Sequence, residues 1–354
     1  MCEVAIGAMN DRLQTESKFY SNLHKSEFMD VQDIGDRLIA VGSRGVIAFS
    51  DDEGVTWSQA YVPISSSLNA LHFPSEDHGW VVGHAGVILH SSDRGETWKL
   101  QYDGQRAVED QLVLAEKKLT LMREAFDKAD SVGKEELEYD LEDAEFAVSD
   151  AKFEKSLGPA NPFLDVWFRN NKHGYAVGAY GLFFATVDGG ENWEIKSDRL
   201  ENYDRYHLNS ISGLGDTGVL IVGEAGTVFG SYNEGLDWEV LYTPYQGSFF
   251  GIQETERGVI AYGLKGSLYR SEDEGKAWEK VELNISTTLT SSDVDESGEI
   301  TLVGFSGVVL KSSDEGRTFT KVEQNGYDSY TGVVGTKNSG LVLISDKGVS
   351  YGAK

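Results

Sequence analysis

The sequence of 354 residues predicts an all-β protein made of repeats, with one helical insertion. Three observations support this fold class. A Gly-x-x-Gly step recurs at a nearly fixed interval, an acidic turn follows each step, and a segment rich in helix-forming residues interrupts the series once. Each repeat of about 40 residues holds four short β-branched and aromatic runs, which is typical of one β-propeller blade. The sequence therefore predicts a seven-bladed β-propeller with an inserted antiparallel α-helical hairpin.

The glycine steps set the number of repeats. Successive steps begin 40 to 45 residues apart, except that Gly83 and Gly178 are 95 apart. The additional residues between these two steps place the insertion between the second and third repeats. The steps begin at Gly42, Gly83, Gly178, Gly223, Gly263 and Gly304, with a degenerate copy at Ser345.

The acidic turns have the pattern Ser/Thr-x-Asp/Asn-x-Gly-x-x-Trp/Phe, first seen from Ser50 to Trp57. An Asp or Asn at the third position accepts hydrogen bonds from backbone N–H groups of its own turn, and the Gly supplies a positive φ. We therefore predict a structural role, because turns on separate blades cannot converge on one ligand. Calcium binding or acid chemistry is the alternative. The residues concerned are Asp52, Asp93, Asp188, Asn233, Asp273 and Asp314.

The seventh repeat stops before it reaches an acidic turn, since only nine residues follow Ser345. A last blade that lacks a strand would expose a sheet edge. We therefore predict that a segment within Glu3 to Asn22 supplies the outer strand of blade seven.

The insertion runs from about Gln105 to Ser156 and contains no proline. Its apolar residues alternate steps of four and three, which is a heptad seam. A break at Asp130 to Gly133 separates two seams, so we expect an antiparallel hairpin with arms about 35 Å long. The seams are Val108, Leu112, Ala115, Leu119, Met122, Phe126 and Ala129, then Leu137, Leu141, Ala144, Val148 and Ala151. The expected organisation is one propeller domain: residues 1–103 form blades one and two with the closing strand, 104–158 the hairpin, and 159–354 blades three to seven.

Apolar residues also recur every seven positions away from these seams. They are Leu114 and Leu121 on the first helix and Tyr139, Phe146 and Phe153 on the second. Exposed rows of this kind are typical of contact surfaces, so we predict that the arm binds a partner. The alternative is that the hairpin folds back and buries these residues against its own propeller.

A second predicted surface lies in the connections that lead into blades four, five and seven, where aromatic residues should open on one face of the ring. These residues could bind a partner or ligand, or they could fill the space between blades. They are Tyr203, Arg205, Tyr206, His207, Tyr245, Phe249, Phe250, Tyr327 and Tyr330.

The remaining residues predict no enzyme, cofactor or metal. The seven histidines have no metal-ligand spacing, and Cys2 is the only cysteine. Asp30, Asp165 and Asp204 could neighbour one another at a channel mouth, either as a solvated rim or as an acid/base pair. The formal net charge of −27 disfavours nucleic acid and anionic membrane surfaces as partners. No apolar stretch approaches the roughly 20 residues of a membrane-spanning helix.

The acidic turn is similar to the Asp-box, or BNR repeat. Its combination with Val-Gly-x-x-Gly resembles the photosystem II assembly- and stability-factor-like propellers, in particular their bacterial, transporter-associated branch. Blade five departs from the pattern with Tyr262, and blade seven lacks both marks. The run from Asn161 to Phe168 also resembles the bacterial members. The Val-Gly pairs begin at Val41, Val82, Val177, Val222 and Val303.

The resemblance implies a non-enzymatic scaffold, an accessory or assembly factor for a membrane protein complex, with an RND-type transporter as one candidate. The alternative is a carbohydrate-binding or glycosidase-type Asp-box propeller. Since such proteins are generally exported, we expect a periplasmic location with the signal peptide removed and no direct membrane insertion. A lipid anchor at Cys2 is the less expected variant.

Overall fold

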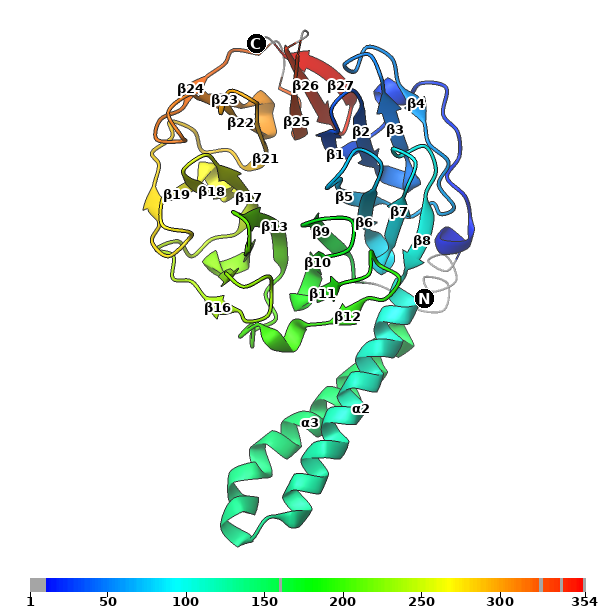
Figure 1. Cartoon of the computed structure of the whole chain (residues 1–354), viewed down its shortest axis with the longest axis vertical. Coiled ribbons are helices and arrows are strands. Elements are labelled where there is room, and N and C mark those ends of the chain that lie inside the picture. Colours follow the sequence, from blue (N-terminus) through cyan, green and yellow to red (C-terminus); the bar gives the residue numbers. More distant parts are fainter. Residues whose placement is uncertain (1–10, 159–160, 325–326, 338–339, 353–354) are drawn as a thin grey trace.

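A computed structural model of the chain describes residues 11–158, 161–324, 327–337 and 340–352. The described residues form seven antiparallel sheets around a central channel, and a two-helix arm projects from the rim of the ring (Figure 1). Six sheets have four strands and the last has three. The predicted fold class, a seven-bladed propeller with a helical hairpin, is confirmed.

Each blade is a simple meander in which strand order follows the chain, with the first strand next to the channel. Blade one holds β1 (Phe28–Asp33), β2 (Leu38–Gly42), β3 (Ile47–Ser50) and β4 (Ser58–Gln59). Blade two holds β5 (Leu68–His72), β6 (Gly79–Gly83), β7 (Ile88–Ser91) and β8 (Lys99–Tyr102). Blade three holds β9 (Phe163–Phe168), β10 (Gly174–Gly178), β11 (Phe183–Thr186) and β12 (Glu194–Ile195).

The later blades repeat this plan. Blade four holds β13 (Leu208–Leu214), β14 (Gly218–Gly223), β15 (Val228–Ser231) and β16 (Glu239–Val240). Blade five holds β17 (Phe249–Thr255), β18 (Gly258–Gly263), β19 (Leu268–Ser271) and β20 (Glu279–Lys280). Blade six holds β21 (Leu289–Val294), β22 (Ile300–Gly304), β23 (Val309–Ser312) and β24 (Thr320–Lys321). Blade seven holds β25 (Tyr330–Thr336), β26 (Gly340–Ser345) and β27 (Gly348–Gly352).

The glycine step closes the turn between the second and third strands of a blade. In blade one, a Cβ on Gly42 would lie 2.0 Å from the carbonyl oxygen of Glu27, so only glycine lets the inner strand approach this closely. Short 3₁₀ turns follow in six blades, and further ones precede β1 and follow β12. They are η1 (Leu23–Lys25), η2 (Ser43–Gly45), η3 (His84–Gly86), η4 (Ala179–Gly181), η5 (Ser197–Arg199), η6 (Glu224–Gly226), η7 (Leu264–Gly266) and η8 (Phe305–Gly307).

The hydrophobic core lies between neighbouring blades. Ile39 and Val41 of blade one, for example, share a buried cluster with Leu71 and Val81 of blade two. Because each blade buries apolar surface against the next, neighbouring blades stabilise one another.

The predicted closing strand is absent from the part of its range that the structure describes, residues 11–22. These residues run along the outer edge of blade one and the connection that follows it. The N–H of Ser17 donates to the carbonyl of Val62 at 3.0 Å, and the N–H of Tyr20 donates to the side-chain oxygen of Gln59 at 2.9 Å. The prediction is therefore wrong for residues 11–22. Hydrogen bonds to Gln59 of blade one and to Val62 of the next connection hold this segment away from blade seven. Residues 3–10 of the predicted range lie outside the described residues.

Side-chain packing joins the last blade to the first. Phe28 and Leu38 of blade one share a buried cluster with Val342 and Ile344 of blade seven. The hydroxyl of Thr331 also donates to the carbonyl of Phe28 at 2.7 Å. In the described residues, the ring is thus closed by contacts between blade one and the three-stranded blade seven.

The arm consists of α2 (Gly104–Lys128) and α3 (Ser131–Leu157). Each helix begins at an aspartate N-cap: Asp103 accepts from the N–H of Arg106 at 3.0 Å, and Asp130 accepts from the N–H of Gly133 at 2.9 Å. Gly133 therefore lies in the first turn of α3, and the connection is shorter than the predicted break.

The two helices pack along the predicted seams. Leu119, Val148 and Ala151 are buried, and the other seam residues are half-buried. Three ion pairs cross between the helices: Arg123 with Glu145 at 2.8 Å, Lys155 with Glu109 at 3.4 Å and Lys152 with Glu116 at 3.6 Å.

Candidate interaction surfaces

The acidic turns use their carboxylates internally. In blade six, Asp314 accepts from the N–H of Thr318 at 2.9 Å, from its hydroxyl at 2.6 Å and from the hydroxyl of Ser312 at 2.8 Å. The hydrogen bonds from Thr318 lower the pKa of Asp314 to about 2. The turns belong to six separate sheets, and these contacts support the structural role predicted for them. The bond from the backbone N–H four residues further on recurs at Asp52, Asp93, Asp188, Asn233 and Asp273.

The innermost strands surround a channel with a cavity of about 1320 Å³. Two carboxylates in it bond to the next blade. Asp30 accepts from the N–H of Leu71 at 2.9 Å, and Asp165 accepts from the N–H of Ile211 at 2.9 Å and from the hydroxyl of Ser210 at 2.8 Å. These side chains connect blade one to two and blade three to four.

Burial in the channel raises the pKa of Asp30 to about 7 and the pKa of Asp165 to about 6, since water stabilises their charged forms poorly there. Asp293 behaves similarly: its pKa is raised by burial to about 6, while it accepts from the N–H of Gly335 in blade seven at 2.8 Å. Asp204, by contrast, lies on an exposed loop. All three half-buried aspartates accept hydrogen bonds from backbone donors, which fits bonding between blades better than acid/base chemistry.

Within the described ranges, no group of three or more His, Cys, Asp or Glu side chains could hold a metal ion. A search of the same residues finds no helix with the length and apolar character needed to cross a membrane.

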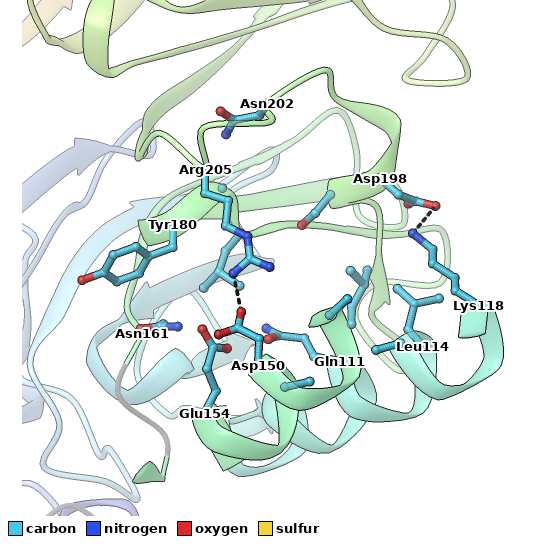
Figure 2. A pocket seen from close by; sticks show the side chains of 17 residues that line it. Gln111, Leu114, Lys118, Asp150, Glu154, Asn161, Tyr180, Asp198, Asn202 and Arg205 are labelled. Carbon is cyan, nitrogen blue, oxygen red and sulfur yellow. Dashed lines mark hydrogen bonds and ion pairs between the residues drawn. The ribbon is translucent and has the colours of Figure 1, made fainter. Parts of the chain in front are cut away.

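The base of the arm meets blade three and the loop into blade four around a cavity of about 280 Å³ (Figure 2). Arg205 contacts Asp150 of α3 at 2.7 Å, and Lys118 of α2 contacts Asp198 at 3.5 Å. Leu114 borders the same cavity. Leu114 and Arg205, which were assigned to two different surfaces, therefore lie at one junction between arm and ring.

The predicted propeller-face residues divide into exposed and buried groups. Tyr203 and Tyr327 are 88% and 87% exposed, and Phe250 is also exposed. Tyr206 and His207 are half-buried, and the ring of His207 meets that of Tyr180 edge-on with centroids 4.8 Å apart.

The prediction of a partner- or ligand-binding role is wrong for Phe249 and Tyr330, because both are buried core residues. Each begins the innermost strand of its blade, the position that Phe28 occupies in blade one. Tyr245 is half-buried, with its ring 4.8 Å from that of Phe249 and 5.2 Å from that of Tyr269. The interpretation as filling between blades is therefore correct for these three residues.

The row on the outside of α3 is open. Tyr139, Phe146 and Phe153 are 77%, 68% and 61% exposed, and Leu121 of α2 is 59% exposed. The arm extends away from the ring (Figure 1), so the propeller does not cover this row. The alternative of a hairpin folded back onto its own propeller is not observed.

Sequence reasoning missed several residues of the arm junction. Tyr180 occupies the turn position at which Arg44 and Lys265 stand in other blades, and all three have a positive φ near 60°. Aligning the repeats with one another would have shown that this position projects from the turns. Asp150 and Asp198 carry no such signal, because their partners lie far away in the sequence.

The ring of Asp-box blades with a projecting helical arm defines a seven-bladed propeller of the Asp-box type. The model of one family, described as photosynthesis system II assembly factor YCF48, matches residues 16–116 and 147–285. The chain belongs to this family, which is one of assembly factors and not of enzymes. The predicted resemblance to the photosystem II assembly-factor-like propellers is confirmed at the level of the family. Between its two matched parts the family model leaves out residues 117–146, the distal part of the arm.

Curated relatives match short stretches. The photosystem II assembly lipoprotein Ycf48 of Synechococcus sp. (strain CC9902) is 36% identical over 83 residues, 23% of this chain and 24% of the relative. Its counterpart from Synechococcus sp. (strain RCC307) is 40% identical over 62 residues, 18% of this chain and 19% of the relative. The chain thus spans about a quarter or less of the length of these relatives.

Solved structures match the whole ring. YCF48 bound to D1 peptide aligns with a TM-score of 0.62 at 15% identity, covering 94% of this chain and 95% of that one. YCF48 from Cyanidioschyzon merolae aligns with a TM-score of 0.60 at 13% identity, covering 95% and 97%. At these identities the likeness shows the fold alone.

Proposed function

We propose that this protein is a non-enzymatic scaffold that assists the assembly or stability of a membrane protein complex. The observation that carries the proposal is the family match, which covers blades on both sides of the arm. The relatives are named as photosystem II assembly lipoproteins, and one similar structure is of a protein bound to a D1 peptide. A propeller with an open face and a projecting arm offers two surfaces to such a complex.

The finer proposal is that the complex is an RND-type transporter of the cell envelope. Only the resemblance to bacterial members of the group supports this finer proposal. The relatives named above are photosystem II factors and do not support a transporter. We propose further that the chain is exported to the periplasm. The relatives are named as lipoproteins, which supports export. Cys2, the candidate lipid acceptor, lies outside the described residues.

Affinity purification tests the function. The tagged full chain is expressed in its native host, cross-linked in intact cells and purified from detergent-solubilised membranes, and an unrelated exported protein with the same tag is the control. We expect the subunits of one membrane complex to be enriched over the control, and the amount of that complex to fall when the gene is deleted.

If no membrane protein is enriched and no complex is depleted in the deletion strain, the scaffold function is wrong. Enrichment of a membrane complex that is not a transporter would reject only the finer proposal. Cell fractionation and the intact mass of the mature protein test export and lipidation. A cytoplasmic chain with an unmodified Cys2 would reject both.

A further inference from the structure

The outer face of α3 carries aromatic residues where a coiled coil normally presents polar ones. Tyr139, Phe146 and Phe153 lie opposite the seam, one in each of three successive heptads. At 1.5 Å per residue they stand about 10 Å apart, so the row extends about 21 Å along the helix. We call these three residues the aromatic strip.

The aromatic strip is flanked by carboxylates and not by bases. Four acidic residues occupy the neighbouring helical positions on either side of Tyr139 and between it and Phe146; all are exposed, and no ion pair involves any of them within the described part of the chain. They are Glu135, Glu136, Glu142 and Asp143.

The lysines of α3 point elsewhere. Lys152 and Lys155 form ion pairs with α2, and Lys134 lies over the ring of Phe126 at 5.3 Å. The seam side of the arm therefore uses its bases internally, and the outer side combines aromatic rings with uncompensated negative charge.

This combination selects among possible occupants. A second copy of the arm would bring like charges together, and an anionic membrane surface would repel the same carboxylates. A helix with one apolar face bordered by Lys or Arg would bury the rings and compensate the charge at once.

We propose that the aromatic strip binds a basic amphipathic helix of a partner protein. The inference rests on the proposed scaffold function and specifies the chemistry of the partner at this site. Tyr139 and Phe146 lie in the segment that the family model leaves out, so the strip serves recognition that the shared propeller does not provide.

Synthetic peptides of about 21 residues test the site, because this length matches the strip with some margin. The probe has Leu in heptad positions on one face and Lys on both flanks. One control peptide replaces Lys by Glu, and another has the probe's composition in scrambled order. Fluorescence anisotropy with the full chain should show binding of the probe alone, weakening as salt is raised because charge contributes to the affinity.

Two variants of the full chain separate the apolar and charged contributions. The double change Tyr139→Ser and Phe146→Ser should weaken probe binding at least about tenfold. Neutralising the four flanking acids to Gln or Asn should weaken it similarly and remove most of the salt dependence. The matched control neutralises four exposed acids on the propeller and should bind like the original chain: Glu191, Glu201, Glu239 and Glu279. Circular dichroism confirms that each variant is folded.

Equal binding of the scrambled peptide, or an equal loss in the propeller control, would overturn the proposal. It is also overturned if the original chain forms dimers that the Ser variant does not form, while the probe fails to bind. If the Ser variant still purifies with the membrane complex and the probe fails to bind, the docking inference is wrong and the scaffold function stands.

Discussion

Arg205 lies 2.7 Å from Asp150, and this ion pair joins the loop that enters blade four to the second helix of the arm. The two residues are 55 positions apart in the sequence, and they meet because the arm leaves the ring beside this loop (Figure 2). This pair and the contact of Lys118, on the other helix, with Asp198 of the propeller hold the base of the arm from two sides.

Arg205→Ala should loosen the arm without unfolding the protein. We expect the free energy of unfolding to change by less than about 1 kcal/mol, because the pair is partly exposed. Hydrogen exchange in residues 147–157 should become faster. Arg199→Ala, an exposed arginine nearby, is the control and should leave exchange in that segment unchanged. Equal exchange in Arg205→Ala and the original chain would show that the pair does not hold the arm.

Asp314→Ala should destabilise blade six by about 1–2 kcal/mol at pH 7, because three hydrogen bonds of the turn are lost. The folded-state pKa of Asp314 is lowered to about 2, below its ordinary value of 3.8, so its contribution exists above pH 4 and is lost as the pH falls through 2. Urea unfolding measures both effects. Glu323→Ala, an exposed change in the same region, should alter stability by less than about 0.5 kcal/mol. If Glu323→Ala lowered the free energy of unfolding as much as Asp314→Ala, the structural role of the acidic turn would be contradicted.

Asp30→Asn should change how stability depends on pH. The folded-state pKa of Asp30 is raised from 3.8 to about 7, so its contribution is fully present below pH 4 and declines as the pH rises through 7. We therefore expect the stability difference between the original chain and Asp30→Asn to shrink by about 1–2 kcal/mol from pH 4 to pH 8. The full value of about 1.4 kcal/mol per pKa unit is an upper limit, because Asp30 borders an open channel. A constant difference across this range would show that the pKa of Asp30 is not raised in the folded state.

Phe28→Ala should weaken the junction between blades one and seven. The side chain is completely buried in a cluster that both blades share, so we expect a loss of about 3–5 kcal/mol in the free energy of unfolding. Phe19→Ala removes the same atoms from a side chain that is 69% exposed and should cost less than about 0.5 kcal/mol. Similar losses at both positions would mean that burial at the junction does not govern stability.

Repetition made the ring and the arm predictable from the sequence. Gly42 and its counterparts mark each blade because the inner strand passes so near that no Cβ fits. Leu119 and Val148 fall on the predicted seams and are buried, since spacing alone decides which side of a helix faces its partner.

Contacts between distant segments were not predictable. Phe249 and Tyr330 were assigned to the surface because they stand in aromatic-rich connections between blades, although their positions in the repeat match that of Phe28. The route of residues 11–22 depends on free groups around Gln59 and Val62, which no local pattern shows. The meeting of Leu114 with Arg205 depends on the angle at which the arm leaves the ring.

The junction of blades one and seven has a mechanical consequence. In the described residues, side chains and single hydrogen bonds connect these blades, whereas a continuous chain connects every other neighbouring pair. A force that pulls blade one away from blade seven therefore strains this junction before any backbone ladder. The first event in forced unfolding should be separation of blades one and seven, which leaves the sheets in an open, curved row.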